Sequence, residues 1–242
     1  MQEQEQERET DSQDDSGPLT AIRRDLVAFG ADLLRRGLLS QTSGNLSVRT
    51  ASDTLCITPS SLQYDRMTDE DIVVCDRRGE VLAGHRIPSS ETPLHCAVYD
   101  ARPDVSAIVH THSPFATTLA VLGYPIPSVH YMIASLGVTR IEIAPYATYG
   151  TPELAASVSD NFTAPARAIL IANHGVVAAG TTLKQAADAA ETVEILAGLY
   201  HRAISVGVPN VLTDAQMAEV MAKYRRKPQP GQPARQAGGP GR

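Results

Sequence analysis

The chain reads Ala107-Ile-Val-His-Thr-His112 near its middle. The apolar first half of this stretch is typical of a buried strand. Alternate strand side chains share a face, so His110 and His112 lie roughly 6.6 Å apart on one side, a span that two imidazoles close around one ion. Alone, the pair fits two unrelated surface histidines equally well. A second apolar run, Ala168–Ala172, ends on Asn173-His174-Gly175 and favours a metal site. Three imidazoles with one open position are typical of a catalytic zinc.

Helical and strand patterns alternate on both sides of that stretch. A helix begins at Pro18, carries an apolar stripe and stops before Gly37. Strands are predicted at 45–48, 54–58, 72–75, 80–83, 107–112, 141–145 and 168–172, and further helices at 91–100, 113–122, 152–161 and 183–206. Hairpin-like strand pairs cluster in the first half of the chain and helices in the second. The expected fold is therefore α/β, with a largely antiparallel central sheet flanked by helices.

Composition indicates one compact domain: the chain has 242 residues, 43% of them hydrophobic, and no tryptophan. Its three cysteines, Cys56, Cys75 and Cys96, form no Cys-x-x-Cys pair, which suits a reducing cytoplasm. No apolar run approaches the roughly 20 residues that span a bilayer, and the N-terminus lacks the basic and apolar segments of a secretory signal. We expect a cytoplasmic protein with no membrane partner.

The charge is concentrated at one end. The net charge is −6, and residues 1–17 alone carry seven acidic residues against one basic residue. The rest of the chain is therefore neutral, which argues against nucleic acid as a partner. The acidic segment 1–17 and the Pro/Gly-rich segment 227–242 are predicted to be disordered tails, and 18–226 to be the catalytic domain.

Three loops rich in hydroxyl groups accompany the histidines. They are Thr42-Ser43-Gly44-Asn45, Thr58-Pro59-Ser60-Ser61 and Ser89-Ser90-Glu91. Taken singly, the first two are turns and the third is a helix cap. Together, beside a metal site, they could converge on a phosphate group through neutral donors, in a chain that has no P-loop.

Glu91 is the only carboxylate within such a loop. A carboxylate near a metal-bound substrate can abstract a proton next to a carbonyl, although Glu91 could also merely complement a helix N-terminus. His95 shares a helix face with Glu91 and is either a metal ligand or, as we favour, a buried structural partner. Tyr131 is either a core aromatic or a proton donor. His85 and His201 are assigned no chemical role.

Seven motifs, in order and spacing, resemble the class II aldolase/adducin family from about Leu19 to Tyr224. They are Thr42–Asn45, Thr58–Ser61, Ser89–Glu91, His110–His112, His130–Met132, Ala144–Thr151 and Asn173–Gly175. The resemblance implies an antiparallel sheet with helices on both sides and a C4 homotetramer with active sites at subunit interfaces. It also implies one Zn²⁺ per subunit, held by His110, His112 and His174.

Residue by residue, the resemblance makes Glu91 the acid/base, which also binds the metal in the resting enzyme, and Tyr131 a proton donor that reaches in from a neighbouring subunit. The phosphate pocket would consist of Thr42, Gly44, Asn45, Ser60, Ser61, Ser89 and Ser90. The implied activity is the reversible cleavage of L-fuculose 1-phosphate, or a close deoxyketose 1-phosphate, to dihydroxyacetone phosphate and a short aldehyde such as L-lactaldehyde. No Schiff-base lysine is needed.

The chain departs from the family pattern in two places. Ser61 stands where the family often has glycine. Arg225-Arg226-Lys227 stands where the aldolases place a tyrosine, with Tyr224 next to it. Within the family, 4-epimerases of L-ribulose 5-phosphate carry Asp in place of Glu91, whereas aldolases or dehydratases of 5-deoxyribulose or methylthioribulose 1-phosphate remain alternatives. Adducin-like binding modules lack the metal ligands that this chain retains, which disfavours a purely structural role.

Overall fold

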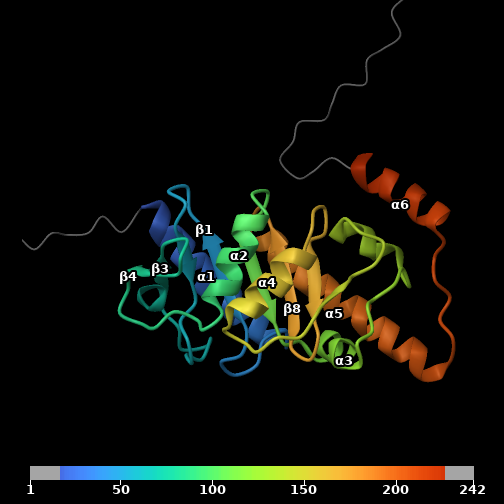
Figure 1. The fold of residues 1–242 in the computed structure, drawn as a ribbon, viewed down its shortest axis with the longest axis horizontal. Coiled ribbons are helices and arrows are strands. Elements are labelled where there is room, and N and C mark those ends of the chain that lie inside the picture. The colour runs from blue at the N-terminus through green and yellow to red at the C-terminus, as the bar shows by residue number, and fades with distance from the viewer. Residues whose placement is uncertain (1–16, 227–242) are drawn as a thin grey trace, which may run out of the picture.

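The protein, seen in a computed structural model that describes residues 17–226, is built on one eight-stranded sheet (Figure 1). The strands are β1 (Asn45–Arg49), β2 (Leu55–Ile57), β3 (Val73–Cys75), β4 (Val81–Ala83), β5 (Ala107–Thr111), β6 (Ile143–Ala144), β7 (Ala168–Ile171) and β8 (Gly175–Gly180). Their order across the sheet is β4-β3-β2-β1-β5-β8-β7-β6. Only the β6–β7 pair is parallel, which confirms the mainly antiparallel sheet.

Helices cover both faces of this sheet. One face carries α1 (Pro18–Arg35), α3 (Pro114–Leu122) and α5 (Leu183–Val206), and the other carries α2 (Thr92–Ala101) and α4 (Pro152–Asn161). In Figure 1, α2 and α4 lie in front of the sheet and α1 and α5 lie behind it. Four of these helices have proline in their first turn, where the missing N–H costs nothing.

Two apolar cores result because the central strands are buried on both faces. In β5, Ala107 and Val109 face the core under α1, α3 and α5, whereas Ile108 faces the core under α2 and α4. Val176 and Val177 of β8 divide in the same way. Continuous apolar runs are expected for strands covered on both sides. Packing on both faces therefore holds the end of β5 and the start of β8 in place, and the histidines lie there.

Most predicted elements are present, with boundaries shifted by one or two residues. The sequence analysis predicts neither β8 nor α6 (Asp214–Arg226). Two short 3-10 helices, Asp69–Asp71 and Tyr131–Leu136 (η2), were missed as well. Strand β8 begins and ends on glycine, a residue that is uncommon in strands. Helix α6 is mostly polar and packs on η2. Apart from Gly17, which immediately precedes α1, the two predicted disordered tails lie outside the described residues.

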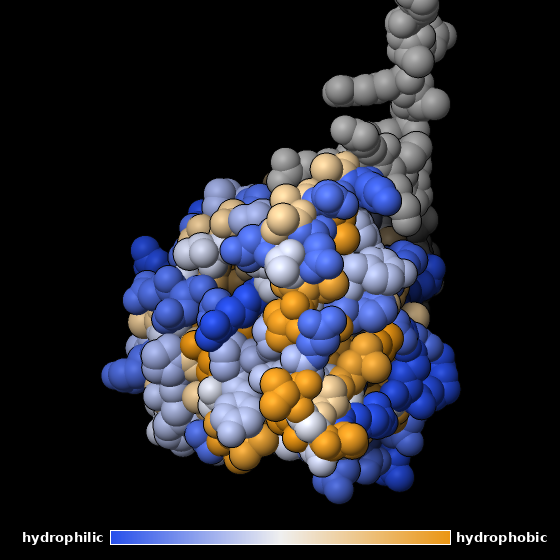
Figure 2. All heavy atoms as spheres, turned by 90° about the vertical axis from the view of Figure 1, so that its right-hand side faces the viewer, coloured by the Kyte–Doolittle hydropathy of each residue, from blue (hydrophilic) through white to orange (hydrophobic). Residues whose placement is uncertain are grey.

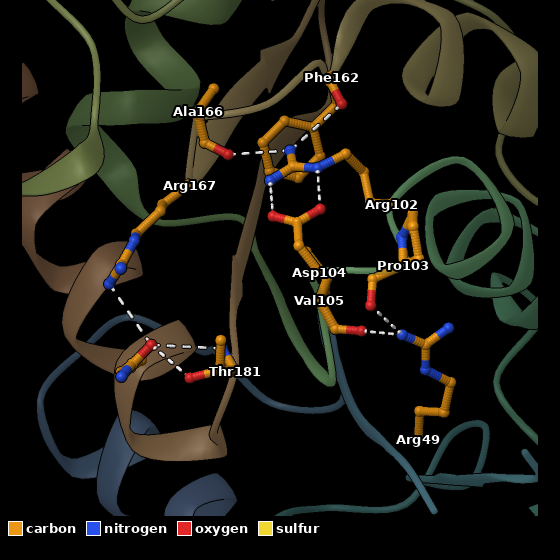
Figure 3. A network of polar contacts seen from close by, with 10 residues as sticks. Arg49, Arg102, Pro103, Asp104, Val105, Phe162, Ala166, Arg167 and Thr181 are labelled. Atoms are coloured by element: carbon orange, nitrogen blue, oxygen red, sulfur yellow. Dashed lines mark hydrogen bonds and ion pairs between the residues drawn. The ribbon is translucent and has the colours of Figure 1, made fainter.

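A buried arginine joins the layer of α2 and α4 to the sheet (Figure 3). Arg102, which follows α2, donates two hydrogen bonds to the Asp104 carboxylate at 2.8 and 2.7 Å. It also donates to the Ala166 carbonyl at 2.9 Å, and its guanidinium lies 5.0 Å from the centre of the Phe162 ring. Hydrogen bonds to a charged group are worth about 1.5–3 kcal/mol each. The N-terminal ends of β5 and β7 are therefore held together with the loop that follows α4.

Two further features of the described part of the chain bear on the expectations. Within residues 17–226, none of the helices has both the length and the apolar content required to cross a membrane. All three cysteines are free: Cys56 and Cys75 are buried and Cys96 is half-buried.

Candidate active site

Four side chains meet at one end of the central strands. His110 is near the end of β5, His112 lies just beyond it, His174 lies in the β7–β8 turn, and Glu91 immediately precedes α2. The Nε2 atoms of His110 and His112 are 2.9 Å apart. The Glu91 carboxylate lies 3.0 Å from His110 Nε2 through Oε2 and 3.2 Å from His174 Nε2 through Oε1. One candidate ligand atom from each residue lies within 4.8 Å of all the others.

The backbone of β8 sets the geometry of this cluster. His110 Nδ1 donates to the Val176 carbonyl at 2.8 Å, which leaves the lone pair of Nε2 directed at the other ligands. Gly175 lies directly against β5. A Cβ atom at this position would be 2.4 Å from the Thr111 carbonyl oxygen and 2.8 Å from the Cδ2 atom of His112. Only glycine lets the β7–β8 turn bring His174 up to the other two imidazoles.

Burial and mutual charge control protonation in the cluster. Burial raises the pKa of Glu91, but His110, His174 and the Asn45 amide outweigh it and hold that pKa below the usual range. Burial and the proximity of His110 lower the pKa of His112 to about 3 and that of His174 to about 4. Burial also opposes protonation of His110, but the Glu91 carboxylate and the Val176 carbonyl outweigh it, so the pKa of His110 is raised. The cluster therefore favours one positive charge beside Glu91.

A divalent metal ion fits these residues. Glu91 Oε1 is buried and has no hydrogen-bond donor, which is costly for a carboxylate oxygen unless a cation faces it. Three imidazole nitrogens and one carboxylate oxygen are a donor set that zinc accepts. His110, His112, His174 and Glu91 would hold the ion.

A cavity of about 500 Å³ opens on this cluster. The residues that line it are Thr42, Ser43, Gly44, Asn45, Pro59, Ser60, Ser61, Ser89, Ser90, Glu91, His112, Tyr146, Tyr149, Asn173 and His174. The structure therefore brings all seven residues of the predicted phosphate pocket to the same cavity as the metal ligands. Tyr146 and Tyr149 had received no role from the sequence, although both lie in one of the quoted motifs.

The loops around the cavity require unusual backbone conformations. Gly44 has φ +83°, and a Cβ atom there would be 2.6 Å from the His110 carbonyl oxygen. Ser61 has φ +58°, in the left-handed region that favours glycine, which accounts for the glycine common at this position in the family. These conformations bring the loops close to the metal ligands.

Three predicted site residues have surroundings that the sequence did not reveal. Asn45 lines the cavity, but its side chain donates to Glu91 Oε2 at 2.9 Å and accepts from His95. His95 is fully buried and lies outside the metal cluster, in agreement with the structural alternative. Tyr131 does not line the cavity of its own chain. It is 51% exposed and lines a second cavity, between η2 and α6, with Tyr224.

Together, the sheet, the two helix layers and a carboxylate among three imidazoles beside hydroxyl loops define a metal-dependent enzyme. The chain belongs to the class II aldolase and adducin N-terminal domain family, whose sequence profile matches residues 24–201. It is a class II aldolase and therefore a lyase.

Several known proteins are similar over nearly their whole length. The 5-methylthioribulose-1-phosphate/5-deoxyribulose-1-phosphate aldolase of Rhodospirillum rubrum is 44% identical, over 86% of this chain and 93% of the relative. The L-fuculose phosphate aldolase of Escherichia coli (strain K12) is 38% identical, over 84% of this chain and 94% of the relative. A solved structure of an L-fuculose 1-phosphate aldolase superimposes with a TM-score of 0.80 at 38% identity, covering 86% of this chain and all of that one.

Proposed function

We propose that the protein is a zinc-dependent aldolase that reversibly cleaves a deoxyketose 1-phosphate to dihydroxyacetone phosphate and a short aldehyde. L-Fuculose 1-phosphate, which would give L-lactaldehyde, and 5-deoxyribulose 1-phosphate, which would give acetaldehyde, are the leading substrates. One observation carries the proposal: a single cavity is lined by the His112, His174 and Glu91 side chains together with three loops of neutral donors.

The loops suit the phosphate end of such a substrate. Backbone N–H groups and the hydroxyls of Ser60, Ser61 and Ser90 are neutral donors, and the first turn of α2 begins directly after Glu91. The amides of Thr92 and Leu94 in this turn already donate to the carbonyls of Ser89 and Glu91, so the loop donors would hold the phosphate. A phosphate held there would leave the carbonyl end of the ketose beside the histidines.

Glu91 is the group that moves a proton in this proposal. When bound, Zn²⁺ supplies a Lewis acid that stabilises negative charge on the substrate oxygens. Cleavage of the C3–C4 bond removes a proton from the C4 hydroxyl and requires one at C3 of the dihydroxyacetone phosphate half. Glu91, buried beside His110 and His174, serves the carbon, and Tyr131 of a neighbouring subunit serves the hydroxyl.

That assignment of Tyr131 rests on a homotetramer with shared sites. It is supported by the position of Tyr131 away from the cavity of its own chain and by exposed apolar side chains on the same side of the molecule. Figure 2 shows apolar residues gathered among polar ones on this side, where α6 and the end of α5 lie. Helices α3 and α5 carry exposed apolar side chains: Val121, Leu122, Ile195, Leu199 and Val206. Light scattering that gave a fully active monomer would overturn the shared site.

The aldehyde end of the substrate is expected near Tyr146 and Tyr149, whose rings add apolar surface to an otherwise polar cavity. The names of the relatives agree in one respect, since all are aldolases of ketose phosphates that lack a terminal hydroxyl. We place the reaction in the cytoplasm, where the three free cysteines would stay reduced.

The test is an enzyme-coupled assay for dihydroxyacetone phosphate. L-Fuculose 1-phosphate, 5-deoxyribulose 1-phosphate and L-ribulose 5-phosphate are each supplied with zinc and with a chelator. Chelator-sensitive release from either ketose 1-phosphate supports the proposal and ranks the substrates. No release, with L-ribulose 5-phosphate epimerised instead, assigns the site to an epimerase.

A further inference from the structure

A chain of buried polar side chains runs away from the metal cluster behind Glu91. Asn45 Nδ2 donates to Glu91 Oε2 at 2.9 Å, and Asn45 Oδ1 lies 2.5 Å from His95 Nε2. On the other side of the ring, His95 Nδ1 lies 2.6 Å from Ser47 Oγ, which lies 2.8 Å from the Tyr99 hydroxyl. All five residues are buried. The chain links the cavity to α2 and β1, two elements on which the site is built.

The ionised carboxylate fixes the direction of every hydrogen bond in this chain. A carboxylate only accepts, so Asn45 must direct its amide N–H groups at Glu91 and its oxygen at His95. His95 must then donate from Nε2, which leaves Nδ1 as an acceptor. Ser47 donates to Nδ1 and accepts from Tyr99. One arrangement of protons therefore satisfies every member.

Asn45 depends on His95 for this orientation. The oxygen and nitrogen of an amide have nearly the same shape, so packing alone does not choose between the two rotamers. The wrong rotamer would direct the amide oxygen at the Glu91 carboxylate and the amide nitrogen at an N–H of His95. A neutral ring with its proton on Nε2 excludes that rotamer. The Ser47 hydroxyl, 2.6 Å from Nδ1, donates to that nitrogen and so leaves the ring proton on Nε2.

Two contacts hold the far end of the chain in place. Arg49 donates to the Tyr99 carbonyl at 3.2 Å, and its guanidinium lies 5.3 Å from the centre of the Tyr99 ring. Arg49 also donates to the carbonyls of Pro103 and Val105, at 2.9 and 2.6 Å (Figure 3). Tyr99 therefore has little freedom to move away from Ser47.

We propose that His95 is a positioning residue: through Asn45 it holds the Glu91 carboxylate in the orientation needed both to bind the metal and to move a proton. It touches neither the metal nor the substrate. The inference rests on the proposed role of Glu91, but it concerns the orientation of that carboxylate rather than the identity of the ketose. Removing a hydrogen-bond partner of a metal ligand typically lowers metal affinity or activity 10- to 100-fold.

The experiment compares three variants of the full-length protein. His95→Phe keeps a ring but removes the donor to Asn45, whereas His95→Gln keeps an N–H group near the position of Nε2. Tyr99→Phe is the matched control, because it removes one hydroxyl from the far end of the same buried chain. The dissociation constant for zinc is measured by competition with a chromophoric chelator. kcat and KM are measured per bound zinc.

His95→Phe should weaken zinc binding and lower kcat by about 10-fold each, with KM changed by less than about 3-fold. His95→Gln should recover most of both losses, and Tyr99→Phe should leave both within about 2-fold of the wild type. A residue that only fills space would not be rescued by Gln, which is smaller than Phe. If His95→Phe does not fold, His95→Gln is compared with His95→Leu.

Two results would overturn the inference: normal zinc affinity and kcat without a donor at position 95, or losses in His95→Gln equal to those in His95→Phe. If the wild type cleaves no ketose phosphate, the proposed function fails. The zinc titrations still decide the role of His95 in that case.

Discussion

Replacing Gly175 by alanine tests whether close contact between β8 and β5 assembles the metal site. The new Cβ atom would lie 2.4 Å from the Thr111 carbonyl oxygen, and real Cβ atoms essentially never come closer than 3.0 Å. The two strands must therefore separate by about 0.6 Å beside Thr111–Val176, the last pair of their register. The new atom would also lie 2.8 Å from Cδ2 of His112, so this proposed metal ligand must move as well.

Such overpacking costs about 1–3 kcal/mol. In a domain of this size it should lower Tm by roughly 2–12 °C. Displacement of His112 should also weaken zinc binding by about 10-fold. Gly207→Ala is the control, because nothing lies within 4 Å of its Cβ position and its backbone is extended. Thermal unfolding of the metal-free proteins and zinc competition are measured for both. If Gly175→Ala matched Gly207→Ala in both, close strand contact would not assemble the site.

Three other substitutions probe separate parts of the account. His112→Ala should lose zinc after dialysis and all activity, whereas His85→Ala should keep both; retained zinc in His112→Ala would remove this histidine from the ligand set. Glu194 accepts from the first two amides of α3 at 2.9 Å each, so Glu194→Ala should cost about 1–2 kcal/mol in urea unfolding. Glu191→Ala, which removes only an ion pair between two partly exposed side chains, should cost under about 0.5 kcal/mol. Burial and the proximity of His110 lower the pKa of His95 from 6.5 to about 3 on folding. The free energy of unfolding should therefore fall as the pH drops from about 6.5 to about 3. His95→Gln should reduce the dependence of that free energy on pH by about 1.4 kcal/mol per pH unit. An equal pH dependence in both proteins would contradict a neutral, buried His95.

Half of the metal cluster is accessible from local spacing: His110 and His112 are two residues apart on a strand, so strand periodicity places them on one face. His174 is distant in the chain, and only its position after a second apolar run and the family resemblance group it with them. The hydroxyl loops were found for a similar reason, since each borders a regular element. Strand β8 was missed because its Gly175 serves the approach to β5, which no local pattern records.

The role of Asn45 illustrates what the sequence could not supply. Its position in a hydroxyl loop predicts a phosphate contact, yet its side chain is engaged by Glu91 and His95, 46 and 50 residues away in the chain. Likewise, the placement of Tyr131 away from its own cavity depends on how η2 packs against α6, an element that was not predicted. Long-range pairing decides both.

In the proposed reaction, Glu91 moves a proton beside a metal that the three histidines would hold. The most direct test is Glu91→Gln, assayed for bound zinc and for dihydroxyacetone phosphate release from the best ketose 1-phosphate. We expect one zinc per subunit and a kcat reduced by roughly 10²- to 10⁴-fold, the usual loss for a missing general acid/base. A Glu91→Gln enzyme that keeps its zinc and cleaves the substrate at the wild-type rate would contradict it.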